Sequence, residues 1–226
     1  MPDILKTLSS IPGTAVLIGL LIATALLVVL VNWRLLIMAL GAEYILIGLM
    51  LTRVVPLELA AVKALVGVMI CPVLYITARR VHWGQRQLES EEEAETTEVA
   101  PRRLSWLISP GLPVRAIIAV LALAFSISLA QRNPFPITSD QVLSRDITVG
   151  TFSVILLGLL NAALAENPLK VGLGLLSILA GFELFYTAIE PTLAIVGLLG
   201  LTNLILALAI AYLTTASVAQ HDEAAK

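Results

Sequence analysis

The segment NWRLLIMALGAEYILIGLMLTR, residues 32–53, is an apolar run bounded by polar residues. Every residue from Leu35 to Thr52 except Glu43 is uncharged, and Glu43 lies at the midpoint of that run. A run of this length indicates a helix that crosses a bilayer, which takes about 20 residues. A carboxyl group at the bilayer centre is costly, and ionisable residues inside a membrane usually mark function. The stretch therefore predicts a membrane helix with a functional carboxyl group at its centre.

The composition of the whole chain agrees with a membrane protein. Of its 226 residues, 58% are hydrophobic and 13% are charged, whereas a soluble domain has about 45–50% apolar and about 25% charged residues. In lipid every backbone amide must be bonded within its own segment, so each apolar run is expected to be a helix. We expect an all-α, polytopic membrane bundle of about seven transmembrane helices. The expected spans are 13–31, 35–52, 57–78, 112–130, 147–165, 169–189 and 192–214.

Several classes of function are excluded by what the sequence lacks. A net charge of −2 and the absence of a basic, aromatic-rich segment argue against nucleic-acid binding. The two histidines, His82 and His221, lie outside every expected span, so haem ligation and a Cys/His metal cluster are excluded. The chain has no phosphate-binding loop, dinucleotide fingerprint or nucleophile elbow. We expect no catalytic residue, no cofactor and no metal, with the lipid bilayer as the surrounding medium.

The positions of the basic residues predict how the chain is oriented in the membrane. The region 79–115 holds six arginines, the densest positive cluster in the chain, and such clusters favour the cytoplasmic side. With seven spans this places the N-terminus outside, and the linker 79–111 and the C-terminus in the cytoplasm. Arg53, Arg132 and Arg145 then fall outside and disagree with the rule.

The two ends of the chain resemble each other at an offset of 135 residues. Asn32 falls on Asn167, and Pro56 falls on Pro191. Two parallel copies of a three-helix unit need one extra crossing between them, which the span 112–130 supplies. We therefore expect a parallel duplication. Its parts are a three-helix unit in 1–78, a polar linker in 79–111, a linking helix and outer loop in 112–146, and a second unit and tail in 147–226.

Two outcomes would satisfy the carboxyl group of Glu43: it takes up a proton, or it pairs with a cation in the bundle. Lys63 is the available cation, four to five residues from the centre of its span, which is roughly 7 Å from the midplane. A lysine stem on a neighbouring antiparallel helix could cover that offset. The pair has two interpretations, a proton relay and a static contact that fixes the helix register.

Three more positions inside the expected spans are candidates. Glu183 lies nearer the outer face and is either a further relay group or an interface carboxylate reached by water. Asn203, in the middle of the last span, suits a hydrogen bond between helices or a hydration point. Ser177 and Gly181 form a small-xxx-small pair, which favours close helix packing.

The residues also resemble a known family. RLLIMALGAEYILIGLML, residues 34–51, is similar to the second helix of the K subunit (chain 4L) of NADH:quinone oxidoreductase, and Glu43 matches its mid-membrane glutamate. The lysine followed by a proline in AAVKALVGVMICPVLYITARR, residues 60–80, looks more like hydrogenase-4 component E, an enlarged K-type relative. The resemblance covers 13–78 well and 148–215 loosely. One departure is that Lys63 stands in the helix where K subunits have a second glutamate.

The resemblance implies a non-catalytic membrane-arm subunit of a complex I-related hydrogenase or dehydrogenase, in a prokaryotic cytoplasmic membrane. Such a subunit carries no cofactor, and its partners are antiporter-like and other membrane subunits. Glu43, Lys63 and Glu183 would contribute to proton or sodium translocation, the choice of ion being open. Two alternatives are a structural membrane scaffold without an ion path and a small transporter that acts alone.

Overall fold

The computed structural model describes residues 13–30, 32–80, 112–132, 141–165 and 167–224. All secondary structure in these ranges is helical. Its helices are α2 (Gly13–Val29), α3 (Trp33–Leu51), α4 (Leu57–Arg80), α7 (Leu112–Arg132), α8 (Gln141–Ala163), α9 (Pro168–Ile189) and α10 (Leu193–Ala224). The all-α prediction is thus confirmed. Residues 81–111 of the predicted linker, residues 133–140 of the outer loop and the first 12 residues lie outside the described ranges.

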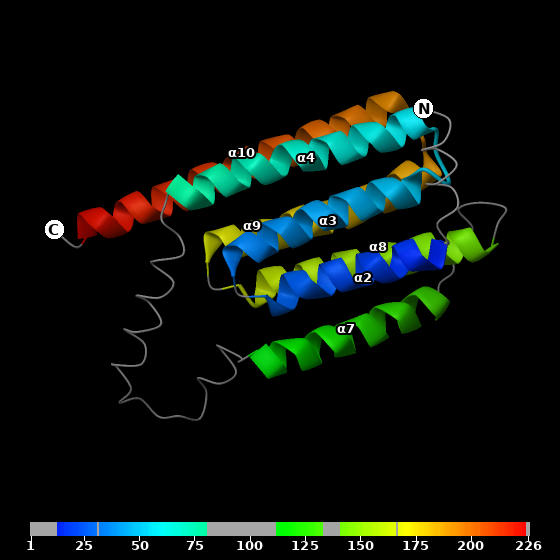
Figure 1. The fold of residues 1–226 in the computed structure, drawn as a ribbon, viewed down its shortest axis with the longest axis horizontal. Helices are drawn as coiled ribbons and strands as arrows, with labels where there is room; N and C mark the ends of the chain where they lie inside the picture. Colours follow the sequence, from blue (N-terminus) through cyan, green and yellow to red (C-terminus); the bar gives the residue numbers. More distant parts are fainter. Residues whose placement is uncertain (1–12, 31, 81–111, 133–140, 166, 225–226) are drawn as a thin grey trace.

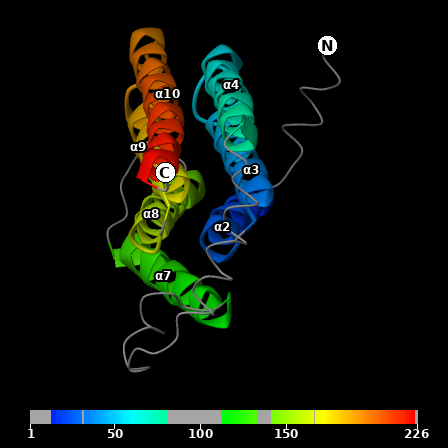
Figure 2. The ribbon, with the colours of Figure 1, turned by 90° about the vertical axis from the view of Figure 1, so that its left-hand side faces the viewer.

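The helices form two layers of three (Figures 1 and 2). One layer is α2, α3 and α4, and the other is α8, α9 and α10, with neighbours in the chain packed side by side in each layer. Across the layers α2 contacts α8, α3 contacts α9 and α4 contacts α10. The remaining helix, α7, lies beside α2 and α8 at one edge. Each helix of the first layer therefore faces the helix at the same position in the second.

The helix ends follow local chemistry. Asn32 caps α3, because its side-chain oxygen accepts a hydrogen bond from the backbone N–H of Arg34 at 3.1 Å. Pro168 stands in the first turn of α9, where its missing N–H costs nothing. Pro72 lies inside α4, where its ring removes one backbone hydrogen bond. The polar turns thus divide the apolar sequence into separate helices.

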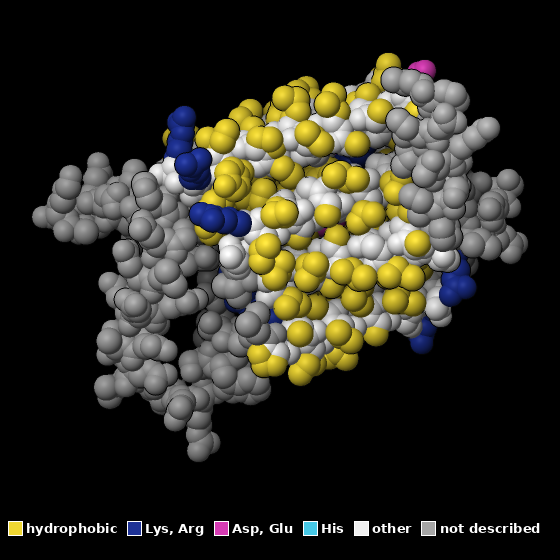
Figure 3. Space-filling model, in the orientation of Figure 1, with side chains coloured by type: hydrophobic (Ala, Val, Ile, Leu, Met, Phe, Trp, Pro, Cys, Tyr) yellow, Lys and Arg dark blue, Asp and Glu magenta, His cyan; other side chains and the backbone are white. Residues whose placement is uncertain are grey.

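The outer surface of the bundle suits a bilayer. In the described ranges six helices are long and apolar enough to cross a membrane: α3, α4, α7, α8, α9 and α10. The helix α2 is also apolar but shorter, with 17 residues. Figure 3 shows apolar side chains over the flank of the bundle and basic side chains gathered at its two ends. Large apolar side chains are exposed rather than buried in this bundle, among them Met38, Ile45, Leu65 and Met69. The chain therefore has the character of an integral membrane protein.

The tightest helix pair is α8 and α9. A Cβ atom on Gly174 would lie 2.6 Å from the backbone nitrogen of Ala162 and 2.7 Å from the carbonyl oxygen of Gly158. A Cβ on Gly181 would lie 2.8 Å from a side-chain carbon of Ile155. Small residues let helix backbones approach closely in a membrane. These glycines therefore hold α9 against α8 and fix the face that α9 turns to the other layer.

The last helix extends well beyond the span expected at 192–214. It has 32 residues, a length of about 48 Å at 1.5 Å per residue, whereas the hydrocarbon core is about 30 Å thick. Its apolar window ends at Ser217. The C-terminal end of α10 projects past the ends of the other helices (Figure 1).

Candidate functional site: a buried polar cluster between the layers

Glu43 lies in the centre of the bundle, with none of its surface exposed. Its Oε1 accepts a hydrogen bond of 2.7 Å from the hydroxyl of Ser177. This contact joins α3 to α9 across the two layers. Its other oxygen, Oε2, has no hydrogen-bond partner. Glu43 is thus held at one oxygen and free at the other.

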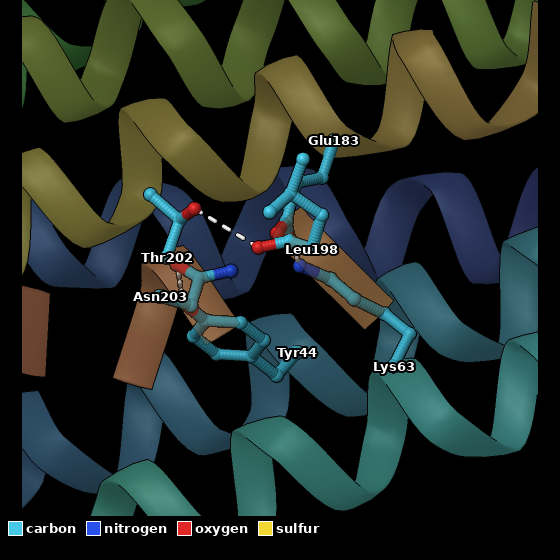
Figure 4. Close-up of polar contacts among 6 residues, drawn as sticks. All are labelled: Tyr44, Lys63, Glu183, Leu198, Thr202 and Asn203. Carbon is cyan, nitrogen blue, oxygen red and sulfur yellow. Dashed lines mark hydrogen bonds and ion pairs between the residues drawn. The ribbon is translucent and has the colours of Figure 1, made fainter. Parts of the chain in front are cut away.

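Lys63 forms a buried ion pair with Glu183 rather than with Glu43. The two side chains are 4% and 2% exposed, so the pair is shielded from water. It joins α4 to α9, again across the layers, and Figure 4 shows the lysine reaching to the carboxylate. Among the described residues, the cluster around this pair therefore holds one buried cation and two buried carboxyl groups, Glu43 and Glu183.

Tyr44 links the pair to α10. Its hydroxyl donates a hydrogen bond of 3.0 Å to Oδ1 of Asn203, and Nζ of Lys63 lies 4.7 Å from the centre of its ring. That distance suits a cation–π contact. The ring lies against Gly67 of α4, where an added Cβ would fall 2.4 Å from the Cβ of Tyr44. Gly67 therefore provides the space in which Tyr44 supports Lys63 and reaches Asn203.

These contacts define the polar cluster: Glu43 and Tyr44 on α3, Lys63 on α4, Ser177 and Glu183 on α9, and Asn203 on α10. All six residues are buried. Each of the three polar contacts joins a residue of the first layer to a residue of the second. The cluster exists only because the two layers meet.

Several atoms of the cluster have no hydrogen-bond partner. Besides Oε2 of Glu43, these include Oε1 of Glu183 and Nδ2 of Asn203. A buried polar group without a partner costs about 1–3 kcal/mol, and such groups in native structures usually call for an explanation. The cluster is thus only partly satisfied by its own side chains.

The structure brings five of the six predicted site residues into one cluster: Glu43, Lys63, Glu183, Asn203 and Ser177. Gly181 lies apart from it, packed against α8. Ser177 donates a hydrogen bond to Glu43 of α3, and Gly181 packs against α8, so their role as a small-xxx-small pair stays a prediction. Sequence reasoning missed Tyr44. The sequence signal for it is a tyrosine in the middle of an expected span, because a buried tyrosine hydroxyl usually finds a hydrogen-bond partner.

The chemistry available to the cluster is proton or monovalent-cation exchange. Among the described residues, no group of three histidine, cysteine, aspartate or glutamate side chains is placed to hold a metal ion. The cluster holds two carboxyl groups and one amine, all able to bind a proton. No family model, curated protein or solved structure matches the chain.

Proposed function

We propose that the chain is a non-catalytic membrane-arm subunit of a complex I-related hydrogenase or dehydrogenase, and that its polar cluster takes part in proton or sodium translocation. The observation that carries this proposal is the burial of one cation and two carboxyl groups in one cluster. Lys63 is paired with Glu183, and Glu43, fully buried, keeps one oxygen without a hydrogen-bond partner.

Charge balance explains why such a cluster would exchange ions. Two carboxylates and one ammonium leave one negative charge without compensation, and an uncompensated charge is costly inside a membrane. One bound proton or sodium ion removes that cost. When Lys63 pairs with Glu183, the exchangeable cation belongs on Glu43. If Lys63 turned to Glu43, the cation would belong on Glu183.

The arrangement of the layers supports a parallel duplication of a three-helix unit. Contacts between α2 and α8, α3 and α9, and α4 and α10 pair each helix with the one at the equivalent position. The cluster lies at the seam between the two units, where repeat-built transporters place their sites. In this proposal α7 is the extra crossing, all seven helices span the membrane, and the N-terminus lies outside.

The free energy for transport would come from neighbouring subunits. A cluster that exchanges one cation has no source of energy of its own, so its occupancy must follow a movement or a charge elsewhere. The partners we propose are antiporter-like membrane subunits, which would cover part of the exposed apolar flank. The membrane would be the cytoplasmic membrane of a prokaryote.

The test begins with purification of the tagged chain in mild detergent and identification of the proteins that accompany it. Glu43→Gln is then introduced into the intact complex, with Glu58→Gln as the control, because Glu58 is exposed in the first turn of α4. We expect Glu43→Gln to abolish coupled ion transport in proteoliposomes and to leave assembly intact. Normal coupling in that variant would refute the relay.

The scaffold alternative is favoured by one observation, the direct ion pair between Lys63 and Glu183. A pair of this kind can fix helix register without moving any ion. Glu43→Gln and a variant that lacks the Lys63–Glu183 pair separate the two functions. If the chain is a scaffold, removal of the pair prevents assembly, and Glu43→Gln transports ions normally. A chain that purifies alone and transports ions in liposomes would instead be a small transporter.

A further inference from the structure

Helices that face each other across the two layers run in the same direction. The order of the colours in Figure 1 shows that α4 and α10 begin at the same end of the bundle, as do α2 and α8. The first residue of α2 agrees with this, because a Cβ on Gly13 would lie 3.4 Å from a carboxylate oxygen of Asp146, in the first turns of α8. Since α2 contacts α8, α3 contacts α9 and α4 contacts α10, the two layers have the same helix order and the same helix directions.

This arrangement excludes a two-fold axis between the layers. An axis along the membrane normal would place α2 against α10 and α4 against α8, and an axis in the membrane plane would make the facing helices antiparallel. The described helices show neither pattern. The relation that remains is a displacement of one layer onto the other without a half turn. The face that α2, α3 and α4 turn toward the second layer therefore corresponds to the face that α8, α9 and α10 turn away from the first.

The exposure of equivalent positions agrees with a displacement. At the offset of 135 residues, which is that of the proposed duplication, Lys63 corresponds to Leu198 and Asn203 corresponds to Val68. Lys63 is 4% exposed, whereas Leu198 is 64% exposed. Asn203 is 0% exposed, whereas Val68 is 55% exposed. In both cases a residue that faces the other layer corresponds to a residue on the outside of the bundle.

A displacement leaves one face of each layer without the partner that its counterpart has inside the chain. A contact between the layers shows which residues would meet if the displacement were repeated: a Cβ on Gly200 of α10 would lie 3.0 Å from a side-chain carbon of Val66 of α4. At the offset of 135 residues Val66 corresponds to Leu201, and Gly200 corresponds to Leu65. Leu201 and Leu65 are 53% and 61% exposed. The outer face of the second layer is thus equivalent to the surface by which the first layer binds it.

We propose that a second copy of this chain packs onto the first by the same displacement, with its α2–α4 layer against the outer face of α8–α10. Both outer faces are apolar on their middle helices, which expose Met38 and Ile45 on α3, and Leu175 and Phe182 on α9. Ala42, also exposed on α3, lets a neighbouring helix approach closely. The contact between copies is therefore apolar packing and holds no second polar cluster. This inference rests on the duplication in the proposed function, but not on ion translocation.

The test is a disulfide cross-link between two differently tagged copies of the full-length chain in membranes, with Cys71→Ser in both to remove the native thiol. One copy carries Leu65→Cys and the other carries Leu201→Cys, so a bond within one chain is impossible. A disulfide needs Cα atoms about 4.4–6.8 Å apart. The matched control replaces Leu201→Cys by Tyr212→Cys. Tyr212 is also exposed on α10 but lies roughly 16 Å further along the helix.

We expect a product that carries both tags from Leu65→Cys with Leu201→Cys, and no product from the control pair or from either variant alone. A chain with both substitutions should give a ladder of dimers, trimers and larger products, because a head-to-tail interface of this kind does not close. Dimers from one variant alone, or a ladder that stops at the dimer, would indicate a two-fold contact and overturn the proposal.

Absence of any product with both tags would also overturn it. That result would leave the relay standing, because the relay is tested by ion transport in Glu43→Gln. Conversely, cross-linking together with normal transport in Glu43→Gln would refute the relay and leave the contact between copies standing.

Discussion

The partner of Lys63 is the feature that a stability measurement tests most directly. Lys63→Met removes the buried ammonium and leaves Glu183 at 2% exposure without its counter-ion. Removing one member of a buried pair typically costs about 3–5 kcal/mol, whereas replacing both members by apolar residues is often neutral or stabilising. We therefore expect Lys63→Met and Glu183→Met each to lower the free energy of unfolding by about 3–5 kcal/mol. The double variant should return to within about 1 kcal/mol of the wild type.

The assay is unfolding of the purified full-length chain by SDS titration from lipid–detergent micelles, followed by circular dichroism. The two single variants and the double variant form a thermodynamic cycle, whose coupling energy isolates the pair. A second cycle, of Lys63→Met with Glu43→Met, is the matched control. It uses the same lysine and a fully buried carboxyl group that forms no ion pair with Lys63 in the described structure.

We expect a coupling of about 5 kcal/mol or more for the Glu183 cycle, and of less than about 1 kcal/mol for the Glu43 cycle. A larger coupling in the Glu43 cycle would refute the pairing of Lys63 with Glu183. It would also support the expectation from the sequence that Glu43 of α3 pairs with Lys63 of the neighbouring helix α4.

Three further substitutions examine the packing around the cluster. Gly67→Ala places a methyl group 2.4 Å from the Cβ of Tyr44 and should destabilise the chain by about 1–3 kcal/mol in the same titration; unchanged stability would mean that α3 and α4 pack less tightly there. Gly174→Ala should also cost about 1–3 kcal/mol, because its methyl group would meet the backbone of α8. Its control, Gly197→Ala, meets nothing within 4 Å and should be neutral or stabilising by up to about 1 kcal/mol. Ser177→Ala removes the donor to the central carboxyl group and should cost about 1–3 kcal/mol; a loss below about 0.5 kcal/mol would contradict that hydrogen bond.

Much of the fold follows from hydropathy alone. The span expected at 35–52 corresponds to α3, Trp33–Leu51, and the span expected at 169–189 corresponds to α9, Pro168–Ile189. The largest deviations are at polar ends: α8 already begins at Gln141, and α10 continues to Ala224. Hydropathy indicates the part of a helix that lies in lipid. Polar residues that extend the same helix beyond the lipid give no hydropathy signal, so their helical structure is missed.

The contacts of the cluster were harder to predict than its members. Ionisable residues stand out in an apolar sequence, so the sequence alone indicates Glu43, Lys63 and Glu183 as candidates. Their pairing depends on which faces the helices turn to one another, and α9 is oriented by its close packing on α8 through Gly174 and Gly181. That rotation places Glu183 toward Lys63. Spacing along one helix carries no information about the rotation of another.

The length of α10 has a mechanical consequence. The helix is a single rod that carries Asn203 inside the bundle and projects beyond it at the C-terminal end. Because a continuous helix transmits rotation along its axis, a twist applied to the projecting end turns Asn203 about the same axis. Its amide would then swing relative to Glu183, which is held on the separate, tightly packed α9. A protein that bound the projecting end and rotated α10 would thus change the orientation of Asn203 in the polar cluster without entering the membrane.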